Sequence, residues 1–168
     1  MKTTKLILLL LVSTCVSFAA NKSTTPRVQN FTQSWKFTLA DSTTNASATT
    51  FDDGKWRTLN LPHDWSIESD FGKDFPASPG GGALPGGLGW YRKTFTVPLT
   101  DKNKRIYIDF DGVYRNSEVW INGISVGKRP YGYSSFRYEL THYIRFGSTN
   151  VIAVKVDNSK EPNSRWYS

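Results

Sequence analysis

The stretch Glu118-Val119-Trp120-Ile121-Asn122-Gly123-Ile124-Ser125-Val126 decides the fold. Two short apolar runs flank an Asn-Gly pair, and both residues of such a pair readily adopt the positive φ angles of a two-residue hairpin turn. The pattern predicts a strand over residues 118–121, a turn at Asn122-Gly123 and a return strand over residues 124–126.

Alternation of apolar and polar residues with a period of two continues on both sides of this hairpin. Residues 105–110 and 151–156 each place apolar side chains on one face of a predicted strand. Further strands are predicted over residues 35–39, 56–61, 90–97 and 134–139. About seven to nine short strands joined by polar turns are typical of an antiparallel jelly-roll sandwich, so we expect an all-β fold.

Length and composition exclude several other classes of protein. The chain has 168 residues, 38% of them hydrophobic, which is enough for one domain with a core. A (β/α)₈ barrel needs about 250 residues and does not fit. The net charge of +7 includes a tight basic cluster, Lys102, Lys104 and Arg105, but this cluster stands beside Asp101 in a polar turn. We therefore expect no nucleic-acid partner.

The first twenty residues are typical of a secretory signal peptide. Lys2 and Lys5 precede an unbroken apolar run over residues 6–12, and small residues lead up to Ala19 and Ala20. The run is too short to cross a bilayer, which takes about 20 apolar residues. We predict a signal peptide over residues 1–20, cleavage after Ala19 or Ala20, no transmembrane span, and a secreted or periplasmic location.

Cys15 opens an alternative for the same leader. Val12-Ser13-Thr14-Cys15 is similar to a bacterial lipobox, which would make the protein an outer-membrane lipoprotein anchored through Cys15. Cleavage after Ala19 or Ala20 would instead remove the single cysteine, so the mature chain would contain none. The Ser/Thr/Pro-rich residues 21–28 are predicted to be a linker in front of the domain.

Residues 70–88 are rich in glycine and proline and predict a long irregular loop. This is not a phosphate-binding loop, because it lacks Gly-Lys-Ser/Thr and is followed by a predicted strand rather than a helix. Glycines let a backbone approach a ligand closely, so the loop is a candidate for a functional role.

Short strings of residues stand in a defined order between residue 30 and the last residue. They are Phe51-Asp52-Asp53, Leu61-Pro62-His63-Asp64-Trp65, Gly89-Trp90-Tyr91-Arg92, Phe110-Asp111-Gly112-Val113, Val119-Trp120-Ile121-Asn122-Gly123, Tyr131-Gly132-Tyr133, Val156-Asp157-Asn158 and Asn163-Ser164-Arg165-Trp166-Tyr167. Together they resemble the N-terminal sugar-binding domain of family 2 glycoside hydrolases, the β-galactosidase and β-glucuronidase group. The pattern is most similar to β-galactosidases of the Bacteroidetes type.

This resemblance implies a galactose-binding-domain-like jelly roll over residues 29–168, beside an immunoglobulin-like domain and a catalytic (β/α)₈ barrel. It also implies hydrolysis of a galactoside with retention, by two barrel glutamates about 5–5.5 Å apart. In the family the chain continues beyond this point with Gly-x-Gly-Ile-Tyr-Arg and a closing strand. We therefore expect a C-terminally truncated domain without its last strand, in which the barrel and the immunoglobulin-like domain are missing.

Four residues are candidates for contact with the sugar. The resemblance implies that residues 163–168 face the barrel, where the amide of Asn163 would bond a sugar hydroxyl. Arg165 would bridge to a barrel carboxylate or form an internal ion pair with Asp64 or Asp157. Asp64 itself either contacts the sugar or binds loop N–H groups while Trp65 packs in the core. Tyr131 either stacks on a sugar ring or helps to plug the open end of the sandwich.

No catalytic residue, metal site or cofactor is predicted within the chain itself. Asp52 and Asp53 precede a glycine and are typical of turns, as is Asp111, whereas Asp109 points away from an apolar face. His63 lacks a nucleophile and a metal-binding neighbour, because the other histidine is far away in sequence. Two alternatives to a hydrolase domain stay open: a stand-alone carbohydrate-binding module, or an inactive truncated gene product with an unpaired sheet edge.

Overall fold

The computed structural model describes residues 27–75 and 84–159, which form two antiparallel β-sheets. The elements along the chain are β1 (Trp35–Ala40), β2 (Arg57–Leu59), the 3₁₀ turn η1 (Trp65–Glu68), β3 (Leu88–Thr96), the 3₁₀ turn η2 (Leu99–Asp101), β4 (Tyr107–Phe110), β5 (Ser117–Ile121), β6 (Ile124–Arg129), β7 (Phe136–Glu139) and β8 (Thr149–Asp157). The predicted signal peptide with Cys15, Ala19 and Ala20, and most of the predicted linker, lie outside the described residues.

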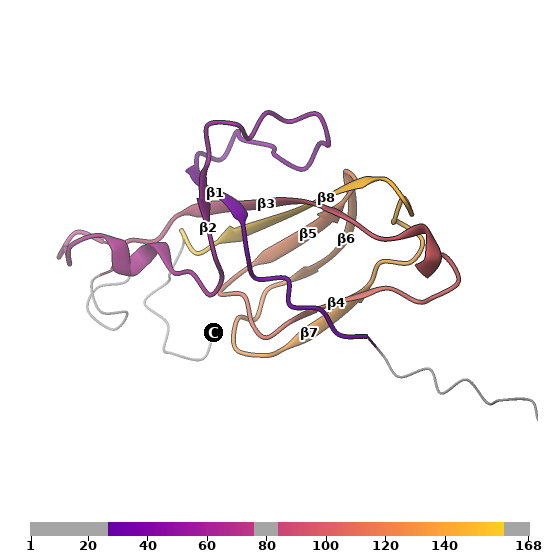
Figure 1. Cartoon of the computed structure of the whole chain (residues 1–168). Coiled ribbons are helices and arrows are strands. Elements are labelled where there is room, and N and C mark those ends of the chain that lie inside the picture. The colour runs from indigo at the N-terminus through magenta and orange to yellow at the C-terminus, as the bar shows by residue number, and fades with distance from the viewer. Residues whose placement is uncertain (1–26, 76–83, 160–168) are drawn as a thin grey trace, which may run out of the picture.

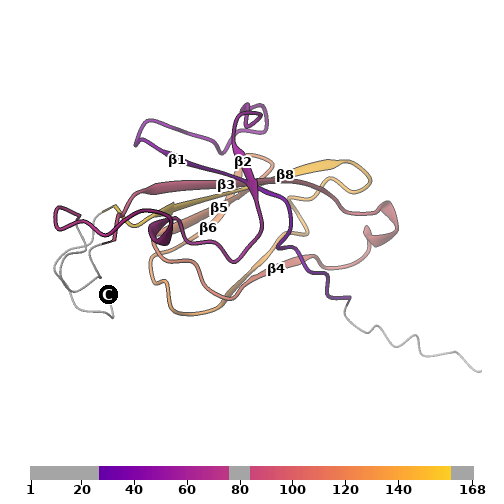
Figure 2. The ribbon, with the colours of Figure 1, turned by 60° about the vertical axis from the view of Figure 1, so that its left-hand side comes forward.

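The two sheets form the layers of a sandwich. Six strands make the larger sheet in the order β2-β1-β3-β8-β5-β6, and β4 pairs with β7 in the smaller one. Figures 1 and 2 show the β4–β7 pair lying beneath the larger sheet. Every named strand pair is antiparallel, so the predicted all-β antiparallel fold is confirmed.

Asn122 and Gly123 form the predicted hairpin turn between β5 and β6, with φ angles of 52° and 85°. The Asn122 side chain also ties the turn to the rest of the sheet. Its Nδ2 donates to the Tyr143 carbonyl at 2.7 Å and to Asn150 Oδ1 at 2.8 Å, and its Oδ1 accepts from the Val151 amide at 3.0 Å. The turn residue therefore helps to fix β5 against β8.

All the predicted strands have somewhat different bounds in the structure, and three of them illustrate why. The strand predicted over residues 56–61 is limited to Arg57–Leu59, because Asn60 accepts from the Ser34 amide through its side chain and the Leu61 amide donates to Thr32. The predicted strand 134–139 begins at Phe136, and the predicted strand 90–97 runs from Leu88 to Thr96. These ends are set by side-chain and loop contacts that alternation does not encode.

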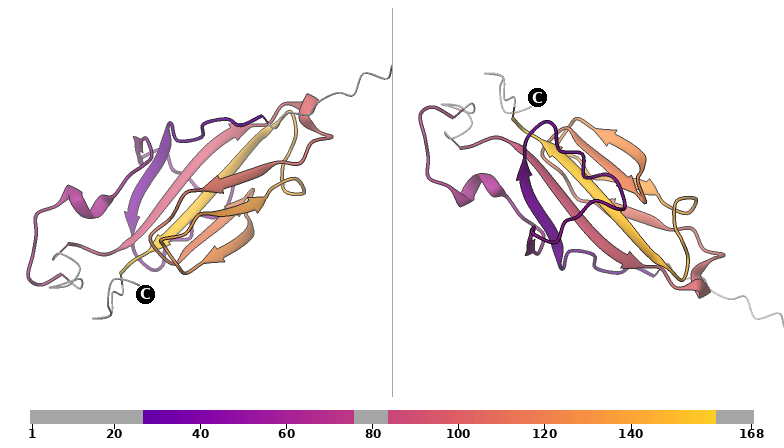
Figure 3. Two further views of the ribbon diagram at one scale, coloured as in Figure 1. Left: turned by 90° about the horizontal axis from the view of Figure 1, so that it is seen from below. Right: turned by 90° about the horizontal axis from the view of Figure 1, so that it is seen from above.

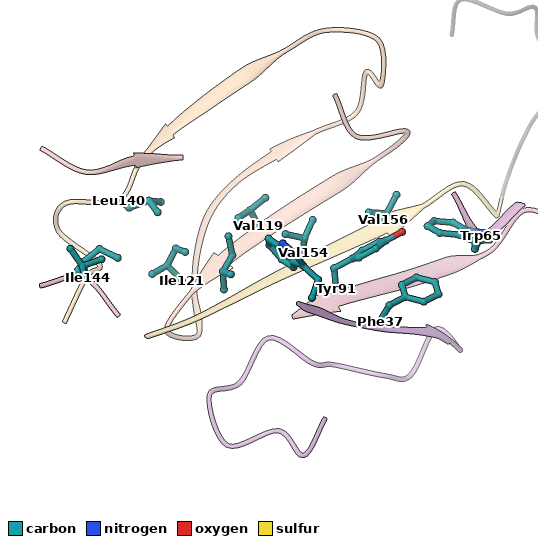
Figure 4. Packing of buried hydrophobic residues seen from close by; sticks show 12 residues of the cluster. Phe37, Trp65, Tyr91, Val119, Ile121, Leu140, Ile144, Val154 and Val156 are labelled. Atoms are coloured by element: carbon teal, nitrogen blue, oxygen red, sulfur yellow. The ribbon is translucent and has the colours of Figure 1, made fainter. Parts of the chain in front are cut away.

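The main core lies between the two sheets (Figure 4). It runs from Leu140 and Ile144 at one end, through Val119 and Val154 in the middle, to Trp65 and Phe37 at the other. Burying apolar surface contributes about 25 cal/mol per Å² and is the main force that holds the layers together. All of these side chains are at most 9% exposed.

A second, smaller core covers the outer face of the larger sheet. The segment between β1 and β2, the loop at the top of Figure 1, lays Ala46 over Trp90 and Ala153. Arg92 is 2% exposed beneath it, and its guanidinium donates to Asp53 Oδ2 at 2.9 Å, to the Ala48 carbonyl at 3.0 Å and to the Ala46 carbonyl. Asp53, expected to be only a turn residue, is therefore also the counter-ion of a buried arginine.

The smaller sheet is cross-linked by exposed ion pairs on its outer face. Arg137 contacts Asp109 at 2.6 and 2.9 Å, and Arg105 contacts Glu139 at 3.1 and 2.6 Å. Hydrogen bonds from Arg105 and from Thr141 lower the pKa of Glu139 from 4.5 to about 2. The ionised form of Glu139 is thus favoured in the folded chain.

Replacement of Arg92 should destabilise the domain strongly. The variant Arg92→Ala leaves Asp53 and two backbone carbonyls without their donor, and loss of one partner of a buried pair costs about 3 kcal/mol or more. Urea unfolding followed by tryptophan fluorescence measures this loss. Arg137→Ala, which removes an exposed ion pair, is the control and should change stability little. Equal losses in the two variants would contradict a special role for the buried arginine.

Glu139 should make stability depend on pH in the acid range. Its folded pKa is lowered, so the carboxylate stabilises the fold fully above about pH 4.5, and this contribution is lost as the pH falls toward 2. Glu139→Gln should therefore be less stable than the parent chain at neutral pH, and the difference should vanish near pH 2. Urea unfolding at a series of pH values measures it. A difference that stays constant with pH would show that the ion pair is not its source.

Candidate functional site

Several loops meet at the end of the sandwich where β8 finishes. Figure 3 shows η1 and the turns that follow β4 and precede β7 at this same end. The Gly87 amide donates to Asn158 Oδ1 at 2.7 Å, and the Asn158 amide donates to the Gly87 carbonyl at 3.0 Å. On the other side the Asp157 amide donates to Arg115, and Asn116 Nδ2 donates to the Asp157 carbonyl, both at 3.0 Å. Asp157 and Asn158 therefore hold two loops together.

Gly86 and Gly89 make close approaches that a side chain would block. A Cβ at Gly86 would lie 2.6 Å from the Asn158 carbonyl oxygen, and one at Gly89 would lie 2.8 Å from the Trp65 ring. Contacts this short do not occur with real Cβ atoms, so the glycines here serve packing between loops. The described end of the glycine-rich segment is thus a fixed part of this end of the sandwich.

Asp64 binds a loop N–H group, which is one of the two roles expected for it from the sequence. Its Oδ1 accepts from the Ser66 amide at 2.8 Å and caps η1, and Ser66 Oγ donates to the Pro85 carbonyl at 2.9 Å. Trp65 is 6% exposed and stacks on Phe37 with the ring centroids 5.8 Å apart, so its ring lies in the core. Contact of Asp64 with a sugar stays a prediction.

A polar cluster around His63 was not foreseen from the sequence. His63 Nδ1 lies 2.7 Å from the Tyr91 hydroxyl, and Nε2 lies 2.8 Å from the Arg57 guanidinium, which also pairs with Glu68. His63 Nε2 also lies 3.2 Å from Glu68 Oε1, so this nitrogen faces both a guanidinium donor and a carboxylate acceptor. Burial raises the pKa of Tyr91, and the hydrogen bond from Arg57 lowers that of Glu68. The cluster fastens η1 to β2 and β3.

Tyr131 belongs to a group of three tyrosines on neighbouring loops. Its ring centroid lies 5.9 Å from that of Tyr133, which lies 5.3 Å from that of Tyr114. The three side chains are 44%, 62% and 39% exposed in that order. Gly132 permits this packing, because a Cβ there would lie 2.5 Å from the Tyr114 ring. Tyr131 is therefore partly open to solvent, and contact of its ring with a sugar stays a prediction.

Two candidate sugar-binding residues and the predicted absence of a metal site and a membrane span remain to be compared with the structure. Asn163 and Arg165 lie outside the described residues, so the structure leaves both predictions untested. No group of three His, Cys, Asp or Glu side chains that could hold a metal ion is present in residues 27–75 and 84–159. Within the same ranges no helix has the length and apolar character needed to cross a membrane.

Comparisons with known proteins agree with the sequence pattern and the fold. Residues 28–166 match the family described as "Glycosyl hydrolases family 2, sugar binding domain". Beta-galactosidase BoGH2A of Bacteroides ovatus is 57% identical over 139 residues, which are 83% of this chain and 16% of that protein. A putative beta-glucuronidase of Formosa agariphila is 53% identical over 138 residues, 82% of this chain and 13% of that protein.

Solved structures show the same relationship. The crystal structure of a beta-glycosidase from Bacteroides vulgatus superimposes with a TM-score of 0.76 and 53% identity, over 83% of this chain and 18% of that one. A family 2 glycosyl hydrolase from Bacteroides cellulosilyticus gives a TM-score of 0.78 with 40% identity, over 83% of this chain and 19% of that one. The chain spans less than a fifth of each of these relatives. It belongs to the family of N-terminal sugar-binding domains of family 2 glycoside hydrolases.

Proposed function

We propose that this chain is the sugar-binding domain of a secreted, β-galactosidase-like hydrolase that cleaves O-glycosyl bonds with retention. The domain shapes the sugar site, and a barrel and an immunoglobulin-like domain of the same protein complete the enzyme. The observation that carries the proposal is the 57% identity to a Bacteroides ovatus β-galactosidase, together with the 16% share of that protein that the chain covers. The loops held by Asp157 and Asn158 are the surface that would meet the sugar.

The charges of the described residues support a division of labour. Retaining hydrolysis needs one carboxylic acid that protonates the leaving oxygen and one carboxylate that attacks. An acid catalyst needs a raised pKa, whereas the pKa values of five carboxyl groups in the described residues are lowered: those of Asp41, Glu68, Asp101, Asp109 and Glu139. None of these five groups has the raised pKa of an acid catalyst, and the family resemblance leads us to propose that the acid and the nucleophile lie on the barrel.

Four residues remain proposed contacts of the sugar. Asn163 and Arg165 follow β8 in the sequence and come a few residues after Ser159, the last residue that the structure describes. Asp64 caps η1 through one oxygen, and Tyr131 presents an exposed ring. An amide, a guanidinium, a carboxylate and an aromatic face are the groups that bind sugar hydroxyls and C–H faces.

The stand-alone carbohydrate-binding module is a second candidate, favoured by the exposed rings of Tyr131 and Tyr133. The gene sequence beyond the codon for Ser168 separates it from the hydrolase domain. An open frame that continues into a barrel supports the hydrolase, and a stop codon followed by measurable glycan binding supports the module. An inactive truncated product is the third possibility, and insoluble expression without a cooperative melting transition would indicate it.

The purified 168-residue chain should not hydrolyse nitrophenyl β-galactoside, because the acid and the nucleophile lie elsewhere. Release of nitrophenol is measured by absorbance, with an intact β-galactosidase as the positive control. A steady rate above that of buffer alone, retained through a second purification step, would refute the proposed division of labour.

The leader should direct the chain out of the cytoplasm. We propose cleavage after Ala19 or Ala20, with attachment of lipid at Cys15 as the alternative. N-terminal sequencing and intact mass of the chain recovered from the expressing bacterium decide between them: cleavage in the first case removes Cys15, and in the second leaves it as the first, modified residue. A chain that keeps Met1 and stays in the cytoplasm would exclude both.

A further inference from the structure

Four segments of the chain come together where β8 ends. A Cβ at Gly86 would lie 3.4 Å from Ser159 Cα, so the end of the described chain lies beside the residues that precede β3. Gly87 in turn adjoins β1 and η1, because a Cβ there would lie 3.4 Å from Leu39 Cδ2 and 3.7 Å from Trp65 Nε1. The polypeptide that follows Ser159 therefore starts close to β1 and η1.

These segments present apolar side chains that face solvent. Leu39 in β1 is 53% exposed, Ile67 in η1 is 70% exposed, and Phe71, four residues further along, is 77% exposed. We call these three side chains the η1 patch. The segment that carries Ile67 is held in place, since Ser66 Oγ donates to the Pro85 carbonyl at 2.9 Å. Exposed apolar side chains on a fixed support are typical of a surface that another segment or protein covers.

Trp65 supplies a second, independent observation. Its ring is only 6% exposed, yet its indole N–H has no hydrogen-bond acceptor within residues 27–75 and 84–159. Most buried donors in folded proteins are paired, because an unpaired one loses its bond to water without a replacement. Nε1 lies beside Gly87 and hence near Leu39, at the η1 patch. A backbone carbonyl of a covering segment would satisfy this N–H group.

The nine residues that follow Ser159 have the length and the side chains to cover the η1 patch. Residues 160–168 read Lys-Glu-Pro-Asn-Ser-Arg-Trp-Tyr-Ser, with two adjacent aromatic residues at Trp166 and Tyr167. Trp166 stands seven residues beyond Ser159, and seven extended residues span up to about 25 Å. From a start beside Gly86, this reach is enough for the aromatic pair to arrive at η1.

Charge also favours this segment as the occupant. Residues 68–74 contain three acidic side chains and one basic side chain, whereas residues 160–168 contain two basic side chains and one acidic side chain. Within the described residues Glu68 pairs with Arg57, while Asp70 and Asp74 are exposed and form no ion pair. Opposite charges on the two segments favour their association and help to fix its register.

We propose that the η1 patch is the docking surface for residues 160–168 of the same chain. Trp166 packs on Ile67 and Phe71, and a backbone carbonyl of the segment accepts from Trp65 Nε1. The docked segment fixes the two proposed sugar contacts that it carries at the same end as η1. That consequence for the sugar rests on the proposed function, whereas the docking itself does not.

The test is a double-mutant cycle in the 168-residue chain, with urea unfolding followed by circular dichroism. Ile67→Ala and Trp166→Ala should each raise the equilibrium constant of unfolding by about fivefold, and the double variant should raise it little more than either alone, because contacting residues are not additive. Hydrogen exchange of the Trp65 indole N–H, measured by NMR, is the second readout. This proton should exchange severalfold faster in Trp166→Ala than in the parent chain.

Leu99→Ala is the matched control, because Leu99 is a 64% exposed apolar residue in η2, at the opposite end of the sandwich (Figure 1). Its effect should add to that of Trp166→Ala. Phe71→Ala replaces Ile67→Ala in the cycle if the latter does not fold.

Three results would overturn the proposal: additive effects in the cycle, an unchanged exchange rate at Trp65, or coupling that appears only at concentrations where sedimentation shows a dimer. The last result would assign the η1 patch to a second copy of the chain. None of these measurements uses a sugar or hydrolysis, so their failure leaves the hydrolase assignment intact.

Discussion

The structure depends on the pairing of β8 with strands on both of its sides. β8 pairs with β3 from Thr149 to Asp157 and with β5 from Ile152 to Lys155. Its side chains are buried on both faces, toward the main core through Val154 and toward the second core through Ala153. Residues 150–154 and Val156 are buried, so both faces of this strand gain burial and it holds the two cores in one register. The end of this strand then presents Asp157 and Asn158 to the neighbouring loops.

The sequence predicted the strands and the hairpin turn because these depend on local patterns. Alternating apolar residues located β4 and β8, and the Asn122-Gly123 pair located the turn to within a residue. The second core was not predictable in the same way. In the sequence Arg92 looks like the solvent-facing polar residue of an alternating strand. It is buried because residues 41–56 fold over it and supply Asp53 as its counter-ion. Long-range chain paths are not encoded in a period of two.

The contacts of the candidate site also depend on long-range chain paths that local sequence patterns do not predict. Motif resemblance marked His63, Asp64 and Trp65, and the structure assigns them capping and packing roles. The cluster of Arg57, His63 and Tyr91 joins residues from β2, β3 and the segment between them, with no spacing that reveals it. Tyr131 could be named from the sequence, but its exposure and its neighbours required the fold.

Asn122 both adopts the positive φ angle of the turn and binds neighbouring segments through its side chain. These two roles affect how related sequences should be compared. In a simple hairpin, Asn-Gly and Asp-Gly are nearly interchangeable, because only the backbone angles matter. Here the side-chain amide donates to Tyr143 and Asn150, and a carboxylate cannot donate. Aspartate at this place would preserve the bend yet bring a negative charge against two oxygens. Asparagine and aspartate are therefore not equivalent at this turn, although the backbone angles alone would accept both.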